Sequence, residues 1–292
     1  MTTYLNQKNP HIRDESIVFT EFGHKYTITT DIDSKYISVT TWCHSHFPKF
    51  DADKIIDGMM RNKSNWKPGH KYWGLTKQEI KDMWNQNGAS VSSAGTDLHS
   101  RIEEFMNRED CTTHLDILTK YDRIRNESSS SSDAGIFCTE WEYFLNFVRD
   151  TPNLKPYRTE WMIHDTEMKL AGSIDMIYEN EDGTLSIYDW KRCKSINRVN
   201  LYNKFALTPC ISEMHDTNFW HYALQLNTYR MILERNYEKR VTELYLVQLH
   251  PESDENNYVV IPIPILQVNM DELFTLYTTT TEDNMPTKKM KI

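Results

Sequence analysis

The chain lacks a long apolar segment and lacks any cysteine pattern. None of its 292 residues falls in an apolar run approaching the roughly 18 residues that a membrane-spanning helix needs. The first residues, MTTYLNQKNPHIRDE, contain no apolar stretch typical of a signal peptide. The five cysteines are scattered, odd in number and without a C-x-x-C pair, which argues against a disulfide framework or a zinc knuckle. We therefore expect a soluble, intracellular protein.

The chain also lacks an overall positive charge. Its formal net charge is −9, which by itself argues against a nucleic-acid partner. The local balance differs, because the stretch 189–204 carries five basic residues against one acidic residue. An acidic protein with one basic segment can still bind a phosphate backbone there. The charge pattern permits a nucleic-acid function without requiring it.

The stretch 169–194 predicts a β-hairpin around which the chain is organised. Residues 174–178 and 185–190 are rich in β-branched and aromatic side chains, as strands are. Between them, residues 180–183 (Asn-Glu-Asp-Gly) supply the chemistry of a tight turn.

Three charged residues interrupt this apolar hairpin. Asp175 lies in the first strand, and Asp189 and Lys191 end the second. Side chains two apart on a strand point to the same face, roughly 7 Å from one another. Two carboxylates and an ammonium on an apolar sheet are costly, and a divalent cation shared by the carboxylates would resolve this. The alternative is a salt-bridge cluster on a solvated hairpin.

Besides helices expected from Asp53 and over residues 137–148, two helices predicted before the hairpin concern the site. Thr76-x-x-Glu79 is a capping box, and the helix that it begins is expected to end near Asn87-Gly88. A second helix is expected over residues 93–107. It carries His99 and Glu103, which are four apart and therefore share one face. The alternative for His99 is a hydrogen-bonded packing residue.

Further elements flank the hairpin. Residues 158–163 read as a strand in which Glu160 lies among apolar neighbours, although an edge-strand carboxylate is an alternative. Residues 218–236 predict a long helix with Gln225 and Tyr229 on one face, a pair that could equally form an ordinary helix–helix contact. Strands at 242–249 and 258–263 and a last helix at 270–277 complete the prediction.

The order of these motifs resembles the RecB-like branch of the PD-(D/E)XK nuclease superfamily. The matching motifs are Gly95-x-x-x-His99-x-x-x-Glu103, Glu160, Gly172-x-x-Asp175, Asp189-x-Lys191 and Gln225-x-x-x-Tyr229. Ser38-Val-Thr40 is similar to the start of the same domain in the mitochondrial genome maintenance exonucleases and their relatives. The resemblance covers residues 36–249, and Ile174 stands where the superfamily name places proline.

The resemblance implies an α/β fold with a restriction-endonuclease-like core, in which a mixed central β-sheet is flanked by helices. The expected organisation is an N-terminal extension with a hairpin at 1–35, a nuclease domain at 36–278 and a flexible tail at 279–292.

The resemblance also implies roles for individual residues. The expected metal ligands are His99, Asp175, Asp189 and the backbone carbonyl of Trp190. The catalytic group is expected to comprise Asp175, Asp189, Lys191, Glu160, Gln225 and Tyr229, with Glu103 in a supporting position. The side chains expected to contact nucleic acid are Arg192, Lys194, Arg198 and Tyr229.

The function implied is hydrolysis of DNA phosphodiester bonds with Mg²⁺ or Mn²⁺, as an exonuclease in DNA repair, replication or recombination. Its partner would be DNA that is single-stranded or has free ends. One alternative is a catalytically silent nucleic-acid-binding module, against which the intact Asp175, Asp189 and Lys191 argue. Another is a cap-snatching-type RNA endonuclease, against which the Gln225 and Tyr229 motif argues. A structural scaffold is a further alternative.

Overall fold

The computed structural model describes residues 3–127 and 138–283. A six-stranded mixed sheet forms its centre, with β3 (Ile37–Ser38), β5 (Leu170–Glu179), β6 (Leu185–Lys191), β7 (Val241–Gln248) and β8 (Val259–Pro262) in that order, and with β4 (Lys155–Asp165) paired to β5. The pairs β3–β5 and β6–β7 are parallel, and the other pairs are antiparallel. This confirms the predicted mixed sheet and its central hairpin.

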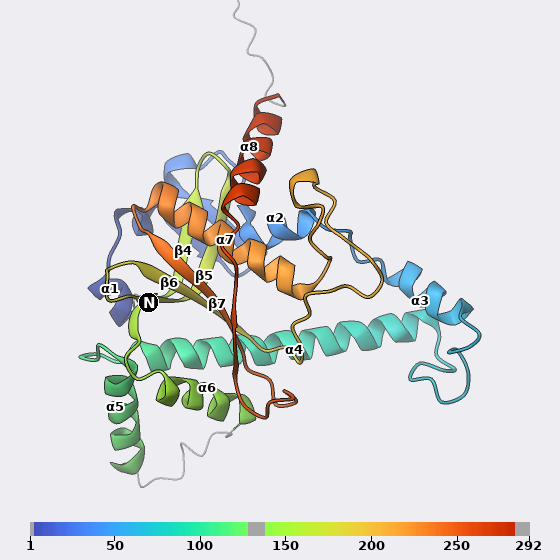
Figure 1. The fold of residues 1–292 in the computed structure, drawn as a ribbon, viewed down its shortest axis with the longest axis horizontal. Helices are drawn as coiled ribbons and strands as arrows, with labels where there is room; N and C mark the ends of the chain where they lie inside the picture. The colour runs from blue at the N-terminus through green and yellow to red at the C-terminus, as the bar shows by residue number, and fades with distance from the viewer. Residues whose placement is uncertain (1–2, 128–137, 284–292) are drawn as a thin grey trace, which may run out of the picture.

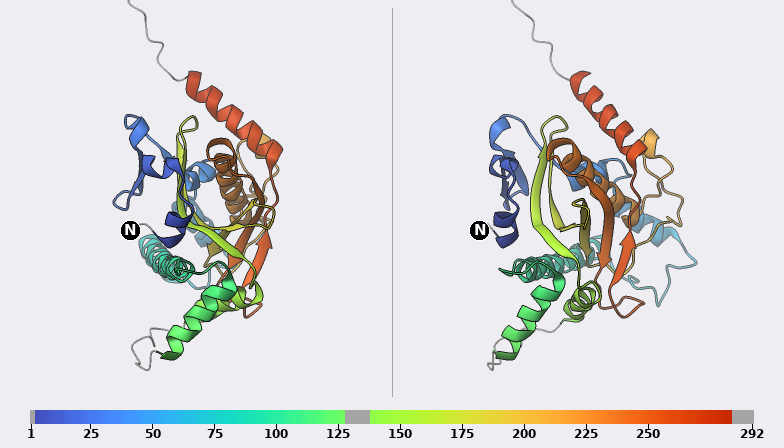
Figure 2. Two further views of the ribbon diagram at one scale, coloured as in Figure 1. Left: turned by 90° about the vertical axis from the view of Figure 1, so that its left-hand side faces the viewer. Right: turned by 60° about the vertical axis from the view of Figure 1, so that its left-hand side comes forward.

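Helices cover both faces of this sheet (Figures 1 and 2). On one face lie α2 (Val39–Ser45), α7 (Asn218–Asn236) and α8 (Gln267–Asp283), and on the other lie α4 (Lys77–Met106), α5 (His114–Glu127) and α6 (Thr139–Asp150). Successive side chains of β6 point to opposite faces of the sheet, so Ile187 packs against the helices on the α7 side and Trp190 against those on the α6 side. The fold is therefore the predicted α/β arrangement, with a hydrophobic core on each side of the sheet.

The N-terminal residues contact the outer strand β4. They form α1 (Tyr4–Lys8), a short 3₁₀ helix η1 (Ile12–Ser16) and the hairpin β1 (Ile17–Thr20) and β2 (Lys25–Ile28), followed by η2 (Thr29–Asp31). Asp14 accepts hydrogen bonds from the Arg158 guanidinium at 2.9 Å and from the Trp161 indole at 2.8 Å, both on β4. Arg158 is only 3% exposed, so Asp14 neutralises a buried cation of the sheet.

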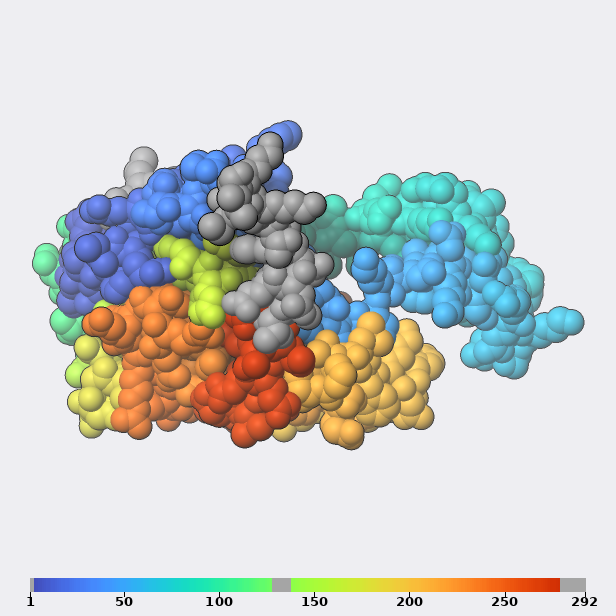
Figure 3. Space-filling model, turned by 90° about the horizontal axis from the view of Figure 1, so that it is seen from above, coloured from blue at the N-terminus to red at the C-terminus, as the bar shows by residue number. Residues whose placement is uncertain are grey.

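Helix α4 differs from its prediction. The capping box at Thr76 and Glu79 is present, but the helix runs without interruption from Lys77 to Met106 and includes Gly88, where an end was expected. A single glycine costs a helix about 1 kcal/mol and does not stop it, and no proline follows. The first half of α4 and α3 (Ala52–Arg61) project from the body as an arm, which Figure 3 shows from above.

Two further elements also differ from expectation. The helix α5 was not predicted at all. Helix α8 continues through Asp283, so residues 279–283, expected in the tail, are helical, and the rest of the predicted tail at 284–292 lies outside the described residues. A last 3₁₀ turn, η4 (Pro209–Ile211), lies in the long connection between β6 and α7.

Candidate active site

The two hairpin carboxylates meet where β5 and β6 separate. The paired residues of these strands run from Glu179 and Leu185 to Met176 and Tyr188, and Asp175 and Asp189 are the next residue on each strand. The Asp175 carboxylate turns towards β6 and accepts a hydrogen bond from the backbone N–H of Trp190 at 3.1 Å. The predicted convergence of Asp175 with the end of β6 is therefore present in the structure.

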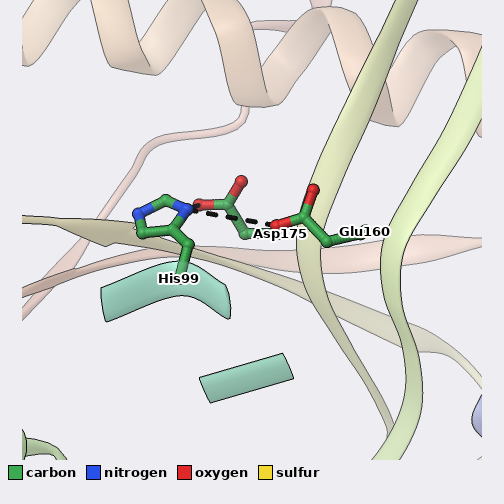
Figure 4. Close-up of side chains that lie close together, drawn as sticks. All are labelled: His99, Glu160 and Asp175. Carbon is green, nitrogen blue, oxygen red and sulfur yellow. Dashed lines mark ion pairs between the residues drawn. The ribbon is translucent and has the colours of Figure 1, made fainter. Parts of the chain in front are cut away.

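A three-residue cluster forms beside this point. His99 comes from α4, Glu160 from β4 and Asp175 from β5, and one ligand atom of each lies within 4.8 Å of the others. His99 Nδ1 is 3.5 Å from Asp175 Oδ2 and 4.0 Å from Glu160 Oε1 (Figure 4). One imidazole nitrogen with two carboxylates is a donor set that suits Mn²⁺ and Mg²⁺. We refer to His99, Glu160 and Asp175 as the acidic cluster.

The orientation of His99 leaves its Nδ1 free for the acidic cluster. Its Nε2 lies 3.0 Å from the backbone carbonyl of Trp190. Because a carbonyl can only accept, Nε2–H donates in this contact, and Nδ1 is the ring nitrogen that faces the two carboxylates. The Trp190 carbonyl, predicted as a metal ligand, thus orients the histidine, the usual role of an outer-shell acceptor.

Electrostatic strain is concentrated on Glu160. Burial, and then the neighbouring Asp175 carboxylate, raise its pKa to about 7, although Ser173 donates a hydrogen bond to Glu160 Oε2 at 2.9 Å. Its backbone has a φ of +43° within a strand, which costs a non-glycine residue of order 1–3 kcal/mol. Burial also raises the pKa of Glu103, one helical turn along from His99. A cation between the carboxylates would relieve this repulsion, so the residues fit a divalent metal.

Asp189 and Lys191 form a separate pair at the end of β6. Lys191 Nζ lies 2.5 Å from Asp189 Oδ2, and their side chains are 17% and 4% exposed. Burial raises the pKa of Asp189 to about 6, whereas the Asp189 and Asp175 carboxylates outweigh burial at Lys191 and raise its pKa above the usual value. Among the described residues, Asp189 does not belong to the acidic cluster, so its expected role as a ligand stays a prediction.

Helix α7 brings Gln225 and Tyr229 to the same region. Gln225 Nε2 donates to the Tyr229 hydroxyl at 3.1 Å and lies 3.5 Å from Thr40 Oγ1 of α2. Tyr229 is only 3% exposed. This burial does not support the predicted contact of Tyr229 with nucleic acid, because the ring is covered by protein and its hydroxyl contacts Gln225.

The packing of Tyr229 explains a glycine of the motif. A Cβ on Gly172 would lie 2.7 Å from Tyr229 Cε1, closer than real contacts allow. Gly172 is thus required by the close approach of the ring to β5. At Gly95, the other glycine of the motif series, a Cβ would meet nothing within 4 Å, and no steric requirement explains that glycine.

The predicted basic segment is largely neutralised by acidic partners. Arg192 binds Glu140 of α6 through Nε at 2.7 Å and Nη2 at 2.6 Å, and Lys194 pairs with Glu252 at 2.8 Å. Both partners are more than fifty residues away in sequence, so a count of local charges could not detect them. The Arg198 guanidinium instead lies 4.2 Å from the Phe219 ring centroid. Of the three basic residues predicted to contact nucleic acid, Arg198 alone has no carboxylate partner among the described residues, and the predicted contacts stay predictions.

Three residues at the site were given no role there from the sequence. Ser173 and Thr40 contact Glu160 and Gln225, as described above. Tyr222 of α7 places its ring centroid 4.5 Å from Lys191 Nζ. Tyr222 precedes Gln225 by three residues, so the helical spacing that singled out Gln225 and Tyr229 could also have identified it.

Comparison with known proteins gives the class. The family model of the PD-(D/E)XK nuclease superfamily matches residues 73–289, a range that contains the acidic cluster, Lys191 and the α7 residues. The chain belongs to the PD-(D/E)XK nuclease superfamily. It is accordingly a phosphodiester hydrolase that acts on nucleic acid, in a superfamily whose members generally use divalent metals.

Two further comparisons add context. The chain is similar to a crystal structure described as a "putative exonuclease" from Eubacterium rectale, with 12% identity, a TM-score of 0.39, and coverage of 85% of this chain and 79% of that one. No curated protein sequence matches the present chain. Within residues 3–127 and 138–283, no helix is long and apolar enough to cross a membrane.

Proposed function

We propose that this protein is a metal-dependent deoxyribonuclease of the RecB-like branch, acting as an exonuclease in DNA repair, replication or recombination. The observation that carries the proposal is the convergence of His99, Glu160 and Asp175 beside the Asp189–Lys191 pair. The order of the motifs supports the RecB-like branch and a similarity to the mitochondrial genome maintenance exonucleases.

The acidic cluster would hold Mg²⁺ or Mn²⁺, with Asp189 as a further ligand. Such a cation, when bound, neutralises charge on the phosphate and lowers the pKa of water. With Nε2–H donating to the Trp190 carbonyl, His99 keeps Nδ1 available for the cation, and this hydrogen bond fixes the orientation of the ring. Glu160 must lose its proton to serve as a ligand, and its raised pKa therefore makes cation binding depend on pH near neutrality.

Lys191 supplies the positive charge nearest to the carboxylates. Its ammonium can donate to an oxygen that becomes more negative as the phosphodiester bond breaks, which is the kind of preorganised stabilisation that contributes most to catalysis. Gln225 offers a neutral side-chain amide held by the Tyr229 hydroxyl. Arg198, at the start of the connection that leads from β6 to α7, would contact the phosphate backbone.

The proposal is tested with labelled oligonucleotides. Linear DNA labelled at the 5′ or the 3′ end, circular DNA and RNA of the same sequence are incubated with the protein and Mg²⁺, Mn²⁺ or EDTA, alongside Lys191→Ala. We expect cleavage of linear DNA that requires metal, is lost with EDTA, and falls by at least about 10³-fold in the variant. The label that is released first gives the polarity.

Other outcomes would replace parts of the proposal. Cleavage of circular DNA would identify an endonuclease. Cleavage of RNA in preference to DNA would favour the cap-snatching type of enzyme. Binding of DNA without cleavage by the folded wild-type protein, under every metal condition, would overturn the enzymatic proposal in favour of a silent binding module.

A further inference from the structure

The Lys191 ammonium has two contacts of different kinds. One is the ionic contact with Asp189, two residues earlier on the same strand. The other comes from a different element, because the Tyr222 ring of α7 lies 4.5 Å from Nζ, within the range of a cation–π interaction. With a side chain 17% exposed, the ammonium is partly desolvated, and this strengthens such a contact.

Tyr222 offers its ring to this contact. It shares one face of α7 with Gln225 and Tyr229, at positions three and seven residues before them, so one helix face contributes three side chains to the site. Within the described part of the chain, the Tyr222 hydroxyl has no hydrogen-bond partner, in contrast to the Tyr229 hydroxyl, which Gln225 contacts. The aromatic face, and not the hydroxyl, is therefore the group that acts on Lys191.

The two contacts of Lys191 differ in what weakens them. The Asp189 carboxylate is expected to be shared with a divalent cation, and sharing its charge weakens its hold on the ammonium. The Tyr222 ring is neutral and is a poor ligand for such a cation, so its contact with the ammonium persists. A flexible four-carbon side chain otherwise has many orientations available once its ion pair loosens.

We propose that Tyr222 is a positioning residue that holds the Lys191 ammonium at the site through the face of its aromatic ring. The inference rests on the proposed nuclease function and goes beyond it by assigning a residue that acts on the lysine. We therefore expect kcat to depend on the Tyr222 ring and on the electron density of its face, and not on the Tyr222 hydroxyl.

The first test compares Tyr222→Phe with Tyr222→Leu in the full-length protein. Phenylalanine keeps the ring, and we expect kcat within about twofold of wild type. Leucine removes the ring, and we expect kcat to fall about tenfold with KM unchanged. Equal losses in both variants would assign the effect to the hydroxyl and overturn the proposal, as would full activity of Tyr222→Leu. A rise in KM at constant kcat would also overturn it, because the ring would then be contacting substrate.

The second test separates electrostatics from shape. Phenylalanine analogues with one, two and three ring fluorines at position 222 keep the ring's form while progressively removing electron density from its face. We expect kcat to decrease with each fluorine, whereas a purely structural role predicts no trend. A flat series would overturn the proposal.

A readout independent of cleavage completes the design. The Lys191 ε-CH₂ protons, observed by NMR in the metal-free protein with ¹³C-labelled lysine, should be shifted upfield by the ring in wild type and Tyr222→Phe. The shift should be lost in Tyr222→Leu, and its presence in that variant would contradict the contact. If the wild-type protein fails to cleave DNA but shows the ring shift, the nuclease proposal fails while the contact itself stands, so the two failures are distinguishable.

Discussion

The candidate active site contains two groups of charges that are balanced in different ways. In the acidic cluster, Glu160 and Asp175 face one another, and burial together with the repulsion from Asp175 raises the pKa of Glu160 to about 7. At the end of β6, Asp189 is neutralised by Lys191 at 2.5 Å. The acidic cluster thus needs a bound cation to balance its charge, whereas the charge of Asp189 is balanced by Lys191.

The largest expected contrast follows from removing one charge from each group. Asp189→Asn leaves the poorly exposed Lys191 ammonium without its ion pair and should destabilise the metal-free protein by about 3 kcal/mol. Asp175→Asn removes repulsion from Glu160, and its amide oxygen can still accept from Trp190 N–H, so stability should stay equal or rise. Urea unfolding in EDTA measures both. A loss of stability of similar size in Asp175→Asn would show that the two groups do not differ as described.

A smaller effect is expected from Gly172→Ala. The added methyl group would collide with Tyr229 Cε1, displacing the ring and the Gln225 amide that depends on it, and kcat should fall about 10²-fold. Gly95→Ala is the matched control, because its Cβ meets nothing within 4 Å and should leave activity unchanged while adding up to about 1 kcal/mol of stability. Equal activities of the two variants would show that the packing of Tyr229 against Gly172 does not support cleavage.

The acidic cluster should also impose a dependence of stability on pH. The folded-state pKa of Glu160, about 7, exceeds its unfolded value of 4.5. The contribution of protonated Glu160 to the free energy of unfolding is therefore complete below pH 4.5 and is lost as the pH rises to about 7. The buried His114 acts in the opposite direction, because burial lowers its pKa from 6.5 to about 3 and stability therefore falls as the pH drops below 6.5. To separate the effect of Glu160 from that of His114, the stability of wild type is compared with that of Glu160→Gln at each pH.

Thermal unfolding in EDTA between pH 4.5 and 8 should show wild type losing stability relative to Glu160→Gln as the pH rises. Addition of Mn²⁺ should reverse the trend in wild type, because the cation binds the ionised carboxylate. Parallel curves for the two proteins in EDTA would contradict the raised pKa of Glu160.

The smallest effects concern the basic segment. Arg192→Ala leaves the Glu140 carboxylate, 6% exposed, without its partner and should lower stability more than it lowers DNA affinity. Arg198→Ala should instead weaken binding of all DNA sequences alike and reduce the slope of log K against log salt by about 1. Fluorescence anisotropy over a salt series, together with urea unfolding, distinguishes the two. If Arg192→Ala reduced the salt slope equally, it too would be a phosphate contact.

Periodicity predicted the elements that carry the site more reliably than the contacts within it. The hairpin around residues 180–183 and the helix over residues 218–236 depend on local turn chemistry and on apolar spacing, and both are present in the structure. The end predicted near Gly88 was wrong, because one glycine does not terminate a helix that continues on both sides. The pairing of Arg192 with Glu140 depends on the tertiary fold and left no local signal.

The same limit applies within the site. The spacing of Asp189 and Lys191 predicted that they share a face, and they form an ion pair there. The sequence could not show that Glu160, from the neighbouring strand β4, joins His99 and Asp175 in the acidic cluster, whereas Asp189 does not. Nor could it show that Tyr229 is covered, since burial depends on how the ring meets Gly172.

The proposed function requires that the acidic cluster bind the divalent cation on which DNA cleavage depends. The most direct measurement is titration of the metal-free protein with Mn²⁺, followed by electron paramagnetic resonance, for wild type and for Asp175→Asn. We expect saturable binding by wild type, with at least a tenfold weaker affinity in the variant and a parallel loss of DNA cleavage. Equal Mn²⁺ affinity in the two proteins, or cleavage of DNA by wild type in the presence of EDTA, would contradict it.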